Sequence, residues 1–113
     1  MKPTINYSDF EKIDMRLGTI LSAVVFEKAK NPAYILEIDF GVLGIKKSSA
    51  QITKHYKPEQ LIGKQIVAVV NFPKKQIANI QSECLVLGSL GIDKGDVVLL
   101  SSDVVVENGS CVS

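Results

Sequence analysis

The segment from Ile13 to Phe26 constrains the fold more than any other part of the chain. Apolar side chains alternate with polar or small ones from Ile13 to Gly18, and a largely apolar run then continues to Phe26. A period of two is typical of a β-strand, and this strand would be unusually long. Gly18 inside it predicts a bulge or a sharp coil, which lets one long strand serve both halves of a barrel.

Four further strands are predicted, and their order indicates the architecture. Tyr34 to Phe40 alternates strictly, Gly41 to Gly44 turns the chain, and Ile45 to Ser49 pairs back to complete a meander. Lys64 to Phe72 and Glu83 to Leu90 supply the other two strands. Five strands in this order, the first long and kinked at a glycine, predict an all-β OB-fold, a five-stranded barrel.

Short helices and a C-terminal extension are expected around this barrel. Ser8 to Glu11 has the spacing of a capping box, which predicts a short helix near the N-terminus. Between the third and fourth strands, Ala50 to Leu61 has helical spacing that Lys57-Pro58 interrupts. Asp96 to Leu100 and Val104 to Glu107 are expected to form a terminal hairpin or an extension. With 113 residues and 46% hydrophobic content the chain can close one modest core, so we expect a single domain over residues 1–113.

Charge is nearly balanced over the whole chain but is unevenly distributed. From Lys46 to Lys75 there are seven lysines and one acid, a net charge of +6, whereas the remainder carries six basic and eleven acidic residues, a net charge of −5. A positive middle between negative flanks steers an anionic ligand to one region. The alternative is that these lysines only protect sheet edges and keep the domain soluble.

The stretch from Ile66 to Leu87 would concentrate this charge at one place. A strand-like run ends at Val70, a short basic loop from Asn71 to Gln76 follows, and a second apolar run begins at Ile80. Two buried strands joined by such a loop would present lysines, an amide and a hydroxyl on one rim, which suits a polyanion.

Catalytic and metal-binding chemistry has little support. Cys84 and Cys111 lack the spacing of a zinc or thiol-exchange pair and are expected to be reduced thiols, and His55 has no second ligand nearby in sequence. No nucleophile with a base, converging carboxylate pair or phosphate-cradling glycine loop stands out. We therefore expect no enzymatic activity, cofactor or metal. The first residues lack an apolar signal core, and no apolar run approaches the roughly 20 residues that cross a bilayer, so a cytoplasmic location is expected.

Three segments resemble a known family. Lys47 to Tyr56 (KSSAQITKHY), Leu61 to Pro73 (LIGKQIVAVVNFP) and Glu11 to Ile20 (EKIDMRLGTI) closely resemble CsaA, a small bacterial and archaeal protein described as a tRNA-binding, export-related chaperone. The likeness runs from about Phe10 to Leu100. More distantly, the chain is similar to the tRNA-binding OB domains appended to methionyl-tRNA synthetases. The resemblance implies tRNA as a partner and a homodimer in which the N-terminal helix and the C-terminal strands cross the interface.

The resemblance also implies which residues bind. In the synthetase relatives one strand ends in Asn-Leu-x-Pro-Arg and the next begins with Ser-x-Gly-Met. Asn71 and Ser82 keep this spacing, Lys75 stands where the arginine would be, and Cys84-Leu85 replaces Gly-Met. Lys30 lies in a loop that corresponds to an RNA-contacting loop of these relatives. The expected tRNA-binding residues are Lys30, Lys46, Lys47, Lys54, Asn71, Lys74, Lys75, Gln81 and Ser82.

The aromatic residues indicate how RNA would be read. The chain has no Trp and only seven Phe and Tyr residues, so stacking platforms for bases are few. We expect Phe10, Phe26, Phe40 and Phe72 in the core, and Tyr34 and Tyr56 exposed. Recognition would then rest on lysines meeting phosphates, with Asn71, Gln81 and Ser82 bonding to riboses or bases of a folded tRNA.

Two other functions remain open beside tRNA binding. One is an export-related chaperone that holds unfolded or precursor polypeptides in an apolar groove near the dimer seam, where strand edges accept an extended peptide. The other is a dimeric accessory module that docks tRNA for another enzyme. The apolar stretches Val97 to Leu100 and Val104 to Val106 exceed what a solvated tail requires and support a dimer.

Overall fold

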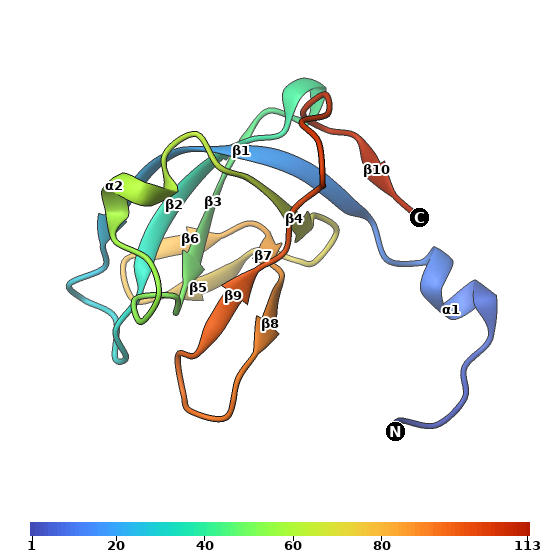
Figure 1. Cartoon of the computed structure of the whole chain (residues 1–113), viewed down its shortest axis with the longest axis horizontal. Coiled ribbons are helices and arrows are strands. Elements are labelled where there is room, and N and C mark those ends of the chain that lie inside the picture. Colours follow the sequence, from blue (N-terminus) through green and yellow to red (C-terminus); the bar gives the residue numbers. More distant parts are fainter.

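The computed structural model describes all residues, 1–113, and shows a nearly closed antiparallel barrel with few helices (Figure 1). Its central sheet has the order β3-β2-β1-β4-β7, which confirms the predicted OB-like all-β fold. The five strands are β1 (Met15–Val25), β2 (Tyr34–Asp39), β3 (Ile45–Ala50), β4 (Gln65–Val69) and β7 (Leu85–Val86).

The core lies inside the barrel and follows the alternation of the strands. In β2, Leu36 and Ile38 are fully buried while Glu37 between them is exposed. Phe40 and Ile20 pack into the same cluster, and Leu61 of the short helix α2 (Pro58–Leu61) closes it from outside the sheet. Burying apolar area of this kind is the main favourable term in folding.

Gly18 has a different role from the predicted one. The register shift of β1 against β2 lies between Ile20 and Ser22, not at Gly18. A Cβ atom on Gly18 would come within 2.7 Å of the Ile38 and Phe40 side chains, both fully buried. The glycine is therefore needed for close packing at the barrel centre, and the bend of β1 falls beyond it.

The two end strands of the sheet close the barrel through side chains and loops. No ladder joins β3 to β7, but the Ser48 hydroxyl donates to the carbonyl oxygen of Cys84 at 3.0 Å. The Glu83 amide donates to the carbonyl oxygen of Lys47 at 2.8 Å. These contacts hold the segment before β7 against the edge of β3.

The helices are short and begin at other residues than predicted. α1 (Tyr7–Glu11) is preceded by Asn6, whose amide donates to the Asp9 carboxylate at 3.1 Å, so the helix begins before Ser8. α2 (Pro58–Leu61) starts at Pro58 instead of being interrupted there, because the first helical turn tolerates a proline. A 3-10 turn, η1 (Gly41–Leu43), joins β2 to β3. None of these helices is long and apolar enough to span a membrane.

Two small hairpins extend from the barrel (Figure 1). β5 (Lys75–Ile77) begins at the end of the predicted basic loop and pairs with β6 (Ile80–Ser82), which lies at the start of the second apolar run. β8 (Gly88–Leu90) pairs with β9 (Val97–Leu99), so the predicted strand from Glu83 to Leu90 is in fact two strands in different sheets.

The C-terminal segment does not form the hairpin considered above. Val104 to Glu107 contains no strand, and β10 (Cys111–Val112) pairs with the start of β1. Polar contacts hold the chain that leads into β10. The Gln65 side-chain amide donates to the Val106 carbonyl at 2.7 Å, and the Arg16 guanidinium donates to the Gly109 carbonyl at 3.0 Å. It is therefore an extension laid along the barrel.

Candidate nucleic-acid interface

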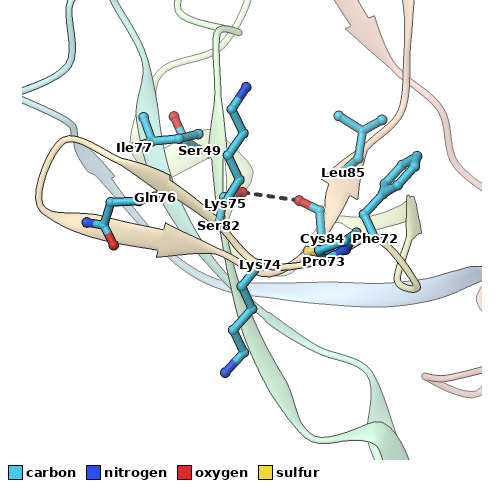
Figure 2. A pocket seen from close by; sticks show the side chains of 10 residues that line it. All are labelled: Ser49, Phe72, Pro73, Lys74, Lys75, Gln76, Ile77, Ser82, Cys84 and Leu85. Atoms are coloured by element: carbon cyan, nitrogen blue, oxygen red, sulfur yellow. Dashed lines mark hydrogen bonds between the residues drawn. The ribbon is translucent and has the colours of Figure 1, made fainter.

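A cavity of about 620 Å³ opens beside the β5–β6 hairpin, between it, β3 and the segments that flank the hairpin (Figure 2). We call it the lysine cavity. Its lining consists of Ser49, Phe72, Pro73, Lys74, Lys75, Gln76, Ile77, Ser82, Cys84 and Leu85. Three expected tRNA-binding residues, Lys74, Lys75 and Ser82, therefore meet at one place.

The two neighbouring lysines of the cavity differ in direction and in charge pairing. Figure 2 shows the Lys74 and Lys75 side chains pointing away from each other. The Lys74 ammonium lies 3.7 Å from the Glu83 carboxylate, whereas Lys75 takes part in no ion pair. Lys75 sits opposite Ser82 in the β5–β6 ladder, so an unpaired cation and a hydroxyl lie on the same face of this hairpin.

Glu83 is a residue of this site that the sequence reading missed. Its carboxylate accepts a hydrogen bond from the Lys47 amide at 3.0 Å and also pairs with Lys74, so it links the lysine cavity to the edge of β3. A signal existed in the sequence, because Glu83 is the only acid between Glu59 and Asp93. A lone carboxylate in a basic region is a candidate for holding its lysines in place.

Lys46 and Lys47 do not join the lysine cavity. They are successive residues of β3 and therefore point to opposite faces of the sheet. Lys46 lies across from Ile38 and is half-buried, while Lys47 lies across from Glu37 and is exposed. Only one of the two can face any given ligand.

Asn71, Gln81 and Ser82 have distinct surroundings. The Asn71 side chain donates to the Lys12 carbonyl at 2.7 Å and accepts from the Asp14 amide at 3.0 Å, so it fastens the segment that leads into β1. The Ser82 hydroxyl donates to the Cys84 carbonyl at 3.3 Å and still lines the cavity. Gln81 is exposed on β6 with no side-chain hydrogen bond, although it does not line the lysine cavity.

Lys30 and Lys54 lie on loops outside the lysine cavity. Lys30 borders a shallow hollow between the β1–β2 loop and Thr53. Lys54 is on the loop after β3, and its ammonium pairs with the Asp93 carboxylate at 3.2 Å. The expected binding residues thus form more than one group, and two of their lysines, Lys54 and Lys74, are paired with carboxylates.

The aromatic residues required the largest corrections. Phe26 and Phe40 are buried as predicted, but Phe10 on α1 is only half-buried, and Phe72 is 54% exposed and lines the lysine cavity. Phe72 comes three residues after β4 ends at Val69 and directly before Pro73, in a segment that has already left the barrel core. An exposed ring beside lysines is a surface on which a base can stack.

The two tyrosines expected on the surface are mainly structural. Tyr34 is 6% exposed, and its hydroxyl donates to the Tyr56 carbonyl at 2.6 Å. Tyr56 is half-buried, and its hydroxyl accepts from the Leu99 amide at 3.0 Å, which ties the β8–β9 hairpin to the loop after β3. Neither ring is free for stacking.

The Cys84 thiol beneath the lysine cavity provides a pH prediction. Burial raises the pKa of Cys84 to about 11. The thiolate is the reactive form of cysteine, so exposed Cys111 should react with iodoacetamide at pH 8 while Cys84 is protected in the folded chain. A raised thiol pKa stabilises the fold below about pH 9, and that contribution, about 2–3 kcal/mol, is lost as the pH rises towards 11.

Urea unfolding of two single variants at pH 8 and pH 11 measures this contribution. The loss between the two pH values should be smaller in Cys84→Ala than in Cys111→Ala by about 2–3 kcal/mol. An equal loss in both variants would show that Cys84 does not titrate as its burial requires.

His55 and the acids near it do not form a metal site. No group of three or more His, Cys, Asp or Glu side chains is placed to hold a metal ion. His55 Nε2 lies 2.5 Å from the Asp96 carboxylate, and this hydrogen bond lowers the pKa of Asp96. Both residues belong to the contact between the loop after β3 and the β8–β9 hairpin.

Comparison with known proteins places this barrel in a family. Residues 15–111 match the family model described as "Putative tRNA binding domain". The crystal structure of chaperone CsaA from Bacillus anthracis superposes with a TM-score of 0.93 at 54% sequence identity, covering 98% of this chain and 100% of that one. The chain belongs to the CsaA family of tRNA-binding domains. The CsaA chaperone protein from Picrophilus torridus is also similar, with 51% identity, a TM-score of 0.89 and coverage of 97% and 100% of the two chains.

The curated relatives are much longer proteins. Methionine–tRNA ligase from Methanococcoides burtonii is 34% identical over 112 residues, which cover 98% of this chain and 16% of the ligase. The ligase from Flavobacterium psychrophilum is 32% identical over 113 residues, again 16% of its length. The chain thus spans about a sixth of the length of these relatives. A methionyl-tRNA synthetase-related protein from Pyrococcus horikoshii, with a TM-score of 0.85 at 24% identity, shares the fold.

Proposed function

We propose that this chain binds tRNA without catalysing a reaction on it, and that the lysine cavity is the centre of the contact. The observation that carries this proposal is that Lys74, Lys75, Ser82 and the exposed ring of Phe72 all line one cavity. Membership of a tRNA-binding domain family supports it.

Each group in the cavity has a separate task in this proposal. The exposed ammonium groups of Lys74 and Lys75 meet phosphates and supply most of the affinity, which does not depend on the RNA sequence. The cavity is large enough to admit one unstacked base, which stacks on Phe72 while Ser82 bonds to the sugar or the base edge. Asn71 acts indirectly, by fixing the start of the segment that carries Phe72.

Replacing Phe72 with alanine tests the stacking contact. Base stacking on an aromatic side chain contributes about 1–3 kcal/mol per base, so tRNA affinity should fall by about 5- to 150-fold. The free energy of unfolding should change by less than about 1 kcal/mol, because the ring is exposed. Filter binding and urea unfolding measure the two effects. A large loss of stability with unchanged tRNA affinity would mean that the ring has a core role after all.

Purification without nuclease at low salt tests the function itself. We expect the absorbance ratio at 260 and 280 nm and an RNA gel to reveal tRNA that elutes with the protein and leaves it at high salt. A preparation free of RNA that also fails to bind added tRNA would contradict the proposal.

A homodimer is part of this proposal. Figure 1 shows α1 standing away from the barrel, and no residue of α1 is buried, with Tyr7 72% exposed. Val104 and Val105 of the C-terminal extension are 68% and 88% exposed. Exposed apolar side chains at both ends of the chain would be buried against a second copy of the chain in a two-fold symmetric dimer. Light scattering should give twice the chain mass of 12.3 kDa.

A second function, chaperone activity, is favoured by one further observation. A groove of about 410 Å³ runs between β3, β7 and the β8–β9 hairpin and is lined mostly by hydrophobic side chains, Leu85, Val97 and Leu99 among them. The unpaired edges of β3 and β7 face it, so an extended polypeptide could add to them as a strand. Suppression of the aggregation of a denatured client that persists at high salt and in lysine variants would support this function.

A further inference from the structure

Three loops meet at a small polar pocket away from the lysine cavity. The β1–β2 loop contributes Asn31, the segment after β3 contributes Gln51, Thr53 and Lys54, and the tip of the β8–β9 hairpin contributes Lys94. The pocket has a volume of about 160 Å³ and shares no lining residue with the lysine cavity. We call it the loop pocket.

Contacts between side chains hold these loops in place. The Lys94 ammonium donates to the Asn31 side-chain oxygen at 3.2 Å, which fastens the hairpin tip to the β1–β2 loop. On the other side, the Lys54 ammonium pairs with Asp93 at 3.2 Å, and His55 Nε2 lies 2.5 Å from Asp96. Loops that are 39 to 63 residues apart in sequence are thereby positioned before any ligand arrives.

The lining has the composition of an anion site. Besides Pro32 and Gly95 it contains two lysines, a hydroxyl and two side-chain amides, and it contains no carboxylate. Ammonium, hydroxyl and amide N–H groups all donate hydrogen bonds, which a phosphate oxygen accepts. Two lysines in a recess attract a negative group more strongly than the same lysines on a convex surface do, and only one of the two, Lys54, is paired with a carboxylate.

Size restricts the ligand further. A volume of 160 Å³ corresponds to about five water molecules at roughly 30 Å³ each. Sites for drug-sized ligands measure about 300–1,000 Å³, so a nucleobase with its sugar or an apolar peptide segment does not fit inside. A single tetrahedral oxyanion does.

We infer that the loop pocket binds a phosphate group, and that in the complex with tRNA it holds a backbone phosphate at a second point, apart from the lysine cavity. The RNA part of this inference rests on the proposed function. It adds Lys94, Gln51 and Thr53 to the binding residues, and it gives Lys54 and the neighbouring Lys30 loop a common ligand.

Asp93 acts as an internal competitor for this ligand. Its carboxylate occupies the Lys54 ammonium in the free protein, and a bound phosphate takes its place. The Asp93→Asn substitution removes the competing charge, so it strengthens phosphate binding. A gain of binding is informative because misfolding of a variant does not produce it. Asp103→Asn is the matched control, since Asp103 is exposed, forms no ion pair, and its replacement changes the net charge equally.

Titration of the full chain with inorganic phosphate, against chloride of equal ionic strength, tests the pocket. Amide NMR signals of Thr53, Lys54, Lys94 and Gly95 should shift and saturate. The dissociation constant should fall about three- to tenfold in Asp93→Asn, stay the same in Asp103→Asn, and rise by a similar factor in Lys94→Gln, which keeps a donor for Asn31. No saturable shift at these residues, or equal effects of the two aspartate variants, would overturn the pocket.

Titration with tRNA separates the two sources of phosphate. Lys94→Gln should weaken tRNA binding about three- to tenfold and make the slope of log affinity against log salt less steep by about one for each pocket engaged. Unchanged tRNA affinity with intact phosphate shifts would assign the pocket to a free anion and overturn its use for RNA. Failure of the unmodified chain to bind tRNA at all, with phosphate shifts intact, would refute the proposed function and leave the pocket standing.

Discussion

Replacing Lys74 and Lys75 together by glutamate should weaken tRNA binding by at least about a hundredfold. Each lost phosphate contact removes counterion release, and each introduced carboxylate repels the backbone. The glutamate at position 74 would also lie beside Glu83, which now pairs with Lys74 at 3.7 Å. A filter-binding or gel-shift titration at fixed salt measures the loss.

The control for this double variant is Lys57→Glu with Lys64→Glu. Both of these lysines are exposed, belong to the same positive segment and form no ion pair, and neither lines the lysine cavity. The two double variants have equal net charge, so the control should lose affinity only modestly. Equal losses would mean that bulk charge and not the cavity binds RNA, and unchanged affinity in the Lys74/Lys75 variant would refute the assignment of the cavity.

Strand alternation made the meander predictable. Tyr34 to Phe40 was expected as a strand, and β2 covers Tyr34–Asp39, because buried and exposed side chains alternate there without interruption. The stretch from Glu83 to Leu90 was harder to interpret, because a continuous apolar run does not say which strand it will pair with. It pairs first with β4 and then with β9.

The sequence pattern indicated that Gly18 has a structural role, but it did not indicate the physical reason. Gly18 was interpreted as a bulge from its place in a strand, yet what forbids a side chain there is the approach of Ile38 from β2 and of Phe40 directly after β2. Such a contact joins residues about 20 positions apart and depends on the register, which local sequence does not show.

The sequence predicted which residues belong to the candidate site, but it predicted only part of their arrangement in space. Lys74, Lys75 and Ser82 come together because a hairpin aligns β5 with β6. Asn71 was expected to bond to RNA, and its side chain in fact bonds to the main chain of Lys12 and Asp14, 57 or more residues away. Lys54 likewise meets an acid 39 residues away. Long-range polar partners of this kind have no local signature.

Two separate cationic sites on one small barrel suit a folded RNA better than a short single-stranded RNA. A rigid RNA presents phosphates at fixed spacings, so it can reach the lysine cavity and the loop pocket together, and the proposed dimer would present each of them twice. Recognition of this kind depends on shape and on backbone charge more than on base sequence.

The salt dependence of tRNA affinity should be very steep. If each subunit of the dimer makes about four phosphate contacts, the slope of log affinity against log salt is about −7, from −0.9 for each contact with a duplex-like ligand. Raising monovalent salt from 50 to 200 mM would then weaken binding by about ten thousandfold. No single substitution is expected to have so large an effect.

Measuring that slope tests the central claim, joint action of clustered lysines on RNA phosphates, most directly. Affinities for tRNA at five or more salt concentrations should fall on a line of slope near −7, and the Lys74→Glu/Lys75→Glu variant should give a much shallower line. Tight binding with a slope between 0 and about −1 would contradict the account, because the RNA would then be held by contacts other than those the lysines make.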